Sequence, residues 1–153
     1  MFVLDTSAFI NGWNDHYDPE TFPAVWDYLA TQLDGGTLIS PRESFEEIKR
    51  QDDSLVEWAG EHEDAFIYPS EEVGRLAGEI QSQFPRPGER NAADPFVIAE
   101  AKIRSFTVVT YEGRSFDGRK TKNWPKRMPG VCVNFGVGCC TLPEVFRELG
   151  ARF

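Results

Sequence analysis

Four acidic residues occupy positions at which a fold of alternating strands and helices would bring side chains together. They are Asp5, Glu47, Asp94 and Glu112. Converging carboxylates repel one another, which raises their pKa values and destabilises the folded protein. A divalent cation removes this repulsion, and hard oxygen ligands suit Mg²⁺ or Mn²⁺. Because such an ion activates water and neutralises charge that develops on a phosphate, we expect metal-assisted hydrolysis of a phosphodiester.

Short apolar runs that alternate with helical patterns must position these acids. Strands are expected at 2–4, 37–39, 107–110 and 137–141. Capping residues, among them Ser40 and Ser70, and apolar residues at helical spacing predict helices over 19–33, from 41, over 54–61, from 71, from 91–95, over 130–135 and over 142–149. This alternation is typical of an α/β fold with a mostly parallel sheet covered on both faces, here one domain over 1–153.

The carboxyl ends of parallel strands form one edge of a sheet, and folds of this class bind their ligands there. Asp5 follows the first predicted strand, and Glu112 lies two residues beyond Thr110, at the end of another. Asp94 begins a helix, and helix starts lie at the same edge. The order of the elements therefore gives three of the acids one expected location.

Each acid also has a purely structural explanation, which stays open at this point. Asp5 and Asp94 stand where residues cap helices, and Pro95 suits a first helical position. Glu47 lies among other charged residues and would simply face solvent, and Glu112 would belong to a surface loop.

Charge is unevenly distributed along the chain. The net charge is −9 over 153 residues, which argues against general electrostatic binding of nucleic acid. Residues 1–100 carry 21 acidic and 6 basic residues, whereas residues 101–153 carry 4 acidic and 10 basic ones.

A basic loop over 113–129 directly follows Glu112 and also contains Phe116 and Trp124. Six basic residues follow Glu112 here: Arg114, Arg119, Lys120, Lys122, Lys126 and Arg127. The loop is either a rim that holds RNA phosphates and stacks on unpaired bases, or a solvated surface segment.

Cysteines, apolar runs and aromatic residues indicate the cellular compartment and the classes of partner. Cys132, Cys139 and Cys140 have no histidine nearby, so we expect no zinc site, and free thiols indicate the cytoplasm. No apolar run approaches the roughly 20 residues of a membrane span, and no signal peptide is expected. Three aromatic residues would either fill the core or line a groove for a partner: Phe22, Trp26 and Trp58.

Four segments resemble the successive motifs of a PIN domain, in that family's order and at its usual separations. They are LDTSA at 4–8, EI at 47–48, DPFVIA at 94–99 and VVTYE at 108–112. The resemblance spans nearly the whole chain. It is closest to a PIN-like branch of unassigned function, with Trp58 and the segment 128–132 also matching.

This resemblance implies a Rossmann-like three-layer α/β/α sandwich and a Mg²⁺- or Mn²⁺-dependent endoribonuclease, often a homodimer. Toxins of type II toxin–antitoxin pairs belong to the same superfamily, so a small antitoxin is an implied partner. Asp5 and Asp94 would be the principal metal ligands, and Glu112 would be a ligand where many relatives have Asp. Glu47 would be the helix acid, with Glu43 as its rival one turn earlier. Three hydroxyl side chains would orient ligands or water: Thr6, Ser7 and Thr110.

Two alternatives accompany this expectation. The longer Glu112 side chain could displace the metal, which would leave a catalytically weak module that binds RNA or a partner protein. A phosphotransfer enzyme on a similar sheet is disfavoured, because the position two residues after Asp5 is Ser7 rather than a second Asp. No histidine is needed as a general base, and His16, the histidine nearest the first motif, is disfavoured because a lone histidine rarely fills that role.

Overall fold

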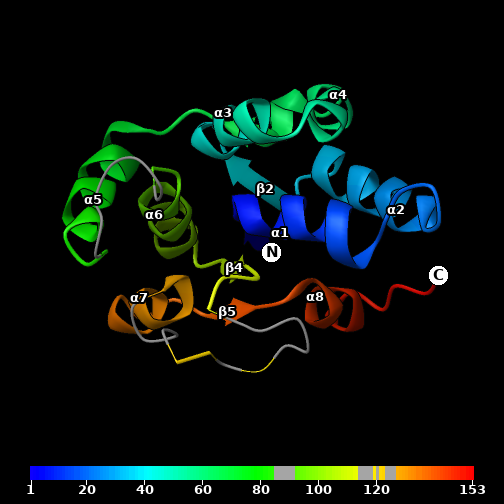
Figure 1. Ribbon diagram of the computed structural model, residues 1–153. Helices are drawn as coiled ribbons and strands as arrows, with labels where there is room; N and C mark the ends of the chain where they lie inside the picture. The colour runs from blue at the N-terminus through cyan, green and yellow to red at the C-terminus, as the bar shows by residue number, and fades with distance from the viewer. Residues whose placement is uncertain (85–91, 114–118, 120, 123–126) are drawn as a thin grey trace.

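Short apolar strands form the centre of a parallel sheet in the computed structural model, which describes residues 1–84, 92–113, 119, 121–122 and 127–153. The central strand is β1 (Phe2–Leu4), which pairs with β2 (Leu38–Pro41) and β4 (Thr107–Val109). The edge strands are β3 (Phe66–Ile67) and β5 (Cys139–Cys140), and every pair among the described residues is parallel (Figure 1). Consecutive apolar residues suit such strands because both faces of a parallel sheet are covered.

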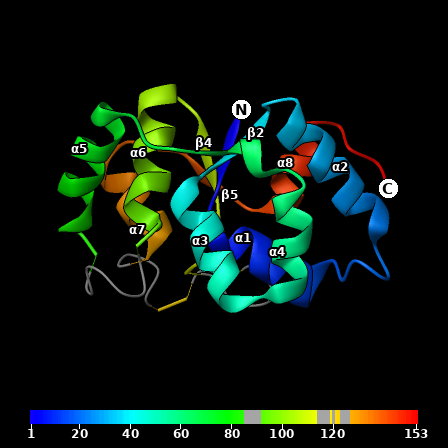
Figure 2. The same cartoon turned by 90° about the horizontal axis from the view of Figure 1, so that it is seen from above.

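Helices pack on both faces of the sheet, as Figures 1 and 2 show. One face carries α1 (Thr6–Asn11), α2 (Pro23–Asp34), α3 (Arg42–Gln51), α4 (Asp53–Gly60) and α8 (Leu142–Glu148). The other carries α5 (Glu71–Gln81), α6 (Asp94–Arg104) and α7 (Met128–Asn134). Phe2 and Leu4 belong to the first apolar cluster and Val3 to the second, because successive strand residues point to opposite faces. The predicted α/β fold with three layers is confirmed.

Several element boundaries differ from the predictions. Ser40 and Pro41 belong to β2 instead of opening a helix, because the Ser40 hydroxyl donates to the Leu4 carbonyl (2.7 Å) and thereby ties β2 to β1. The helix predicted from 19 begins at Pro23. The elements that were not predicted include the edge strand β3, the π-helix η1 (Gly12–His16) and the 3-10 helix η2 (Glu63–Ala65).

The aromatic residues that were expected either in the core or in a groove differ in their burial. Trp26 is buried in the core, Trp58 packs against it half-buried, and Phe22 is exposed. The three cysteines are not joined by disulfides, and Cys132 is buried. None of the helices in the described segments has the length and apolar character that crossing a bilayer requires. The predicted loop ends earlier than 129, because Met128 begins α7.

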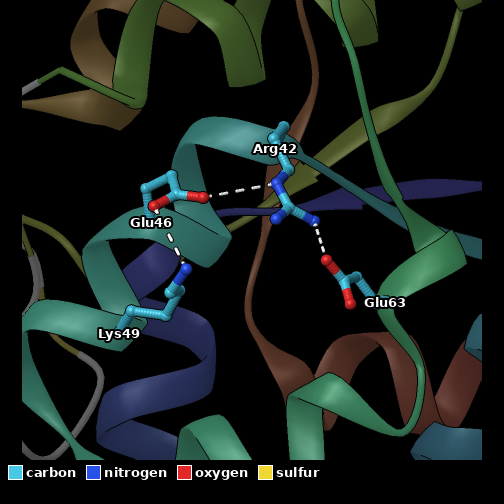
Figure 3. A network of polar contacts seen from close by, with 4 residues as sticks. All are labelled: Arg42, Glu46, Lys49 and Glu63. Atoms are coloured by element: carbon cyan, nitrogen blue, oxygen red, sulfur yellow. Dashed lines mark hydrogen bonds and ion pairs between the residues drawn. The ribbon is translucent and has the colours of Figure 1, made fainter.

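Arg42 links the start of α3 to η2, the segment that leads into β3. Its guanidinium donates to Glu63 at 2.5 Å and lies 3.4 Å from the Glu46 carboxylate (Figure 3). The same group lies over the rings of Phe45 and Tyr68. The Arg42 side chain is only 15% exposed, so solvent screens these contacts less than those of an open surface pair.

We expect Arg42→Met to lower the free energy of unfolding by about 1 kcal/mol. The substitution removes the ion pairs and the cation–π contacts but keeps an apolar stem. Chemical denaturation would measure the change. Arg75→Met is the matched control, because Arg75 pairs with Glu71 on an open helix surface and its loss should have no measurable effect. Equal losses for the two variants would contradict the structural role of Arg42.

Candidate metal centre

Asp5 lies directly after β1 and is the N-cap of α1, so its capping role and its place at the sheet edge coincide. Its Oδ1 accepts hydrogen bonds from the Ala8 backbone (2.8 Å) and the Ser7 hydroxyl (2.7 Å), and its Oδ2 accepts one from Thr110. The side chain is 1% exposed. A carboxylate offers about four lone-pair positions, so these three hydrogen bonds leave room for a further ligand.

The hydroxyls of Ser7 and Thr110 connect α1 to the end of β4. They lie 3.1 Å apart, and each also accepts a backbone hydrogen bond, Ser7 from Tyr111 (2.9 Å) and Thr110 from Glu112 (3.0 Å). Ser7 and Thr110 thus contact Asp5, whereas the expected contact from Thr6 is absent. The buried Thr6 hydroxyl makes no hydrogen bond within the described residues, because Ser7, one position further along the first turn, reaches Asp5 instead.

Asp94 is the first residue of α6, but its side chain does not cap the helix. It is 4% exposed, and its Oδ2 has no hydrogen-bond partner within the part of the chain described. Burying an unpartnered carboxylate oxygen is costly. Capping therefore does not explain Asp94, whereas a role of its carboxylate as a ligand would.

Glu47 extends from α3 to the turn that precedes α6. Its Oε1 accepts a hydrogen bond from the Ala93 backbone at 2.9 Å, and the side chain is buried rather than solvated. Glu43, one turn earlier, has a different neighbour: burial, and then the charge of Glu100, raises its pKa. The structure thus groups Glu47, and not Glu43, with Asp94.

Glu112 lies two residues after Thr110, close to the start of α7. Its Oε2 is 3.4 Å from the Met128 backbone nitrogen, which donates to it. Burial and the charge of Glu47 raise the pKa of Glu112, while Arg127 and Met128 oppose that rise. Glu112 is therefore held by contacts of its own and is not a free loop residue.

The four acids influence one another electrostatically. Burial, followed by the charge of Glu112, raises the pKa of Asp5 to about 7, even though hydrogen bonds to its carboxylate favour the charged form. Burial also raises the pKa of Asp94 well above its ordinary value, with further contributions from Glu112, Asp5 and Glu47. Arg127 opposes this rise. Side chains from four separate segments therefore share one region of negative potential.

The basic loop is described only in part. Arg119, Lys122 and Arg127 are exposed, whereas the other members of the predicted RNA-binding set lie outside the described residues, together with both aromatic residues of the loop: Arg114, Lys120, Lys126, Phe116 and Trp124. The charge of Arg127 lowers the pKa of both Asp94 and Glu112, so one cation of the predicted set lies near the acids. The group formed by Asp5, Glu47, Asp94 and Glu112 is called the acidic pocket below.

A comparison with protein-family models matches residues 2–153 to a domain of unknown function, DUF4411. The chain belongs to the DUF4411 family. No curated protein matches this DUF4411 chain.

The donor set of this DUF4411 chain fits a hard divalent cation. Asp94 has a buried oxygen without a hydrogen-bond partner among the described residues, and the described hydrogen bonds of Asp5 leave one lone-pair position. Glu112 adds a third carboxylate, whose charge raises the pKa of Asp94. Within the described residues, no three acidic, cysteine or histidine side chains already converge on one point. Holding an ion would therefore require at least one carboxylate to turn toward it.

Two backbone donors in this DUF4411 site were not predicted, the amides of Ala93 and Met128 that bind Glu47 and Glu112. A backbone amide carries no residue-type signal, although Pro95 and Pro129 mark the helix starts beside which these donors lie. The ring contact between His16 and Tyr111 was also missed, and no spacing rule would have indicated it.

Proposed function

We propose that the protein is a metal-dependent ribonuclease that hydrolyses phosphodiester bonds of single-stranded RNA. The observation that carries the proposal is the buried acidic pocket, in which an Asp94 oxygen lacks a partner. The position of Arg127 near the acids supports a polyanionic substrate. The choice of RNA rests on the PIN resemblance, which also extends the proposal to a toxin neutralised by a small antitoxin.

Asp5, Asp94 and Glu112 would hold Mg²⁺ or Mn²⁺. Such an ion would neutralise the pocket, lower the pKa of a coordinated water and stabilise charge on the phosphate. Thr110 and Ser7 fix the direction of the Asp5 carboxylate through their hydroxyls.

Glu47 and Arg127 would act on the water and the phosphate. The Ala93 amide holds Oε1 of Glu47, so its other oxygen would orient the attacking water. Arg127 would pair with the phosphate once the charges of Asp94 and Glu112 are neutralised. Each of these residues thus has a separate task in the proposed reaction.

Cleavage of an end-labelled single-stranded RNA tests the proposal, and two neighbouring glutamates provide a matched pair of variants. Activity should require Mg²⁺ or Mn²⁺ and disappear with a chelator. Glu47→Gln should lower the rate by about 10- to 100-fold. Glu43→Gln changes the same charge one turn earlier on α3 and should leave the rate unchanged, because Glu43 lies near Glu100. Equal rates for both variants would remove Glu47 from the site.

One observation favours the alternative of a binding module. Within the described residues, no three acidic side chains meet in a group that could hold a metal ion. Calorimetry with Mn²⁺ separates the two functions. Binding heat that Asp94→Asn abolishes supports the nuclease, whereas no metal-dependent heat together with retained RNA binding supports the module.

A further inference from the structure

One of two stacked rings lies next in the chain to a residue that contacts Asp5. The rings of His16 and Tyr111 have centroids 4.4 Å apart and planes only 9° from parallel, and both side chains are half-buried. Tyr111 lies between Thr110 and Glu112, and its backbone amide donates to Ser7. The backbone of Tyr111 is therefore one hydrogen bond away from Ser7, which itself donates to Asp5.

The Tyr111 ring is not held in place by its hydroxyl group. That hydroxyl is buried and makes no hydrogen bond within the described part of the chain. A tyrosine that served only the core would be expected to satisfy this group. The ring itself packs against the first apolar cluster and stacks on His16.

His16 reaches Tyr111 from an unusual element. It ends the π-helix η1, in which the Tyr17 amide donates to the Gly12 carbonyl at 2.7 Å. π-helical turns are rare and occur frequently at functional sites. The wider turn changes the direction in which His16 leaves the helix relative to a continued α1.

Other residues fasten η1 to the core. The Trp13 indole donates to Ser54 (3.0 Å) and packs edge-on against Trp26 at 4.7 Å, and Asn14 donates to Asp52 (2.8 Å). These contacts attach the π-helix to α2 and α4 without using His16.

We propose that the His16–Tyr111 pair is a subsite for one unpaired nucleobase of the substrate, next to the phosphate that the acidic pocket receives. This inference rests on the proposed ribonuclease function. Parallel rings can extend their stack onto a base, and every base has a face that stacks, so the subsite would tolerate any sequence. Bases in a duplex are already stacked on their neighbours, so the subsite would select single strands.

Equilibrium binding of labelled oligomers of about eight nucleotides tests the subsite. All proteins carry Asp94→Asn, so that the RNA is bound without being cut. One probe is single-stranded RNA, and the other is an abasic oligomer of the same length and charge. His16→Ala should weaken binding of the RNA by about 10-fold and leave binding of the abasic probe unchanged, because only stacking is lost. His16→Phe should restore affinity for the RNA, since it restores a ring.

The other histidine of the chain provides the matched control. His62 packs against Trp58 (5.1 Å) and pairs with Asp34, so His62→Ala should leave RNA binding unchanged. If wild-type protein cleaves RNA but His16→Ala binds RNA as tightly as His62→Ala, the subsite is wrong and the nuclease stands. Equal losses on both probes would show a phosphate contact and also overturn the subsite. If no RNA is bound by the Asp94→Asn protein or cut by the wild type, the subsite and the proposed function fail together.

Discussion

Asp94→Asn is expected to abolish RNA cleavage and, in the same protein, to increase the stability of the metal-free form. The rate should fall by at least about 100-fold, because the substitution removes a proposed metal ligand. The free energy of unfolding without metal should rise by about 1–3 kcal/mol at neutral pH, because asparagine avoids the cost of burying or protonating this unpartnered carboxylate. Cleavage assays and thermal denaturation with a chelator would measure both effects.

Asp27→Asn is the control for this prediction. It changes the net charge equally on the exposed surface of α2, away from the pocket, so both activity and stability should stay at wild-type values. Opposite signs for activity and stability distinguish a functional acid from a structural one. An Asp94→Asn protein that is destabilised, or that still cuts RNA at the wild-type rate, would refute the assignment.

Metal-free protein is expected to lose stability as the pH rises from about 5 to about 8, and Mn²⁺ should restore it. The Asp5 carboxyl keeps its proton up to a pKa of about 7 in the folded protein, whereas its ordinary value is 3.8. Its stabilising contribution is therefore complete below about pH 4 and is lost as the pH passes through about 7. The difference between these two pKa values of Asp5 corresponds to about 4 kcal/mol over the whole range from about pH 4 to about pH 7. The raised pKa of Asp94 changes the stability in the same direction.

Surface carboxylates do not reverse this trend. Burial tends to raise the pKa of Asp52, but hydrogen bonds from Asn14 and its neighbours lower it overall. Its stabilisation is therefore lost only as the pH falls below about 4 and is constant over the range tested. Melting temperatures measured with a chelator and with Mn²⁺ across this pH range would reveal the trend. Stability that increases with pH in the chelator would contradict a buried, metal-free acidic pocket.

The sheet was predictable because its central strands are short apolar runs, which can be recognised without knowing the strands they pair with. β3 was not, since its two residues are a strand only through pairing with Ser40 and Pro41 of β2. Ser40 was assigned to a helix cap because serine often occurs there. Its hydroxyl instead binds the Leu4 carbonyl of the adjacent strand, a contact between residues 36 positions apart.

The location of the acidic pocket was predictable for a geometric reason: chain segments that leave parallel strands do so at one edge. The choice between Glu43 and Glu47 was not, because they are one turn apart and the position of α3 against α6 decides which one approaches Asp94. The His16–Tyr111 stack depends on a π-helical turn, which the spacing of apolar residues does not indicate.

The position of β1 has a consequence for biosynthesis. It is synthesised before β4, with which it pairs, and Asp5 and Thr110, which meet beside these strands, are 105 residues apart. Contacts between such distant residues form late, because closing a long loop costs chain entropy before any contact compensates for it. The acids therefore stay dispersed in the nascent chain. Any activity that depends on their assembly would begin only after β4 has emerged and docked.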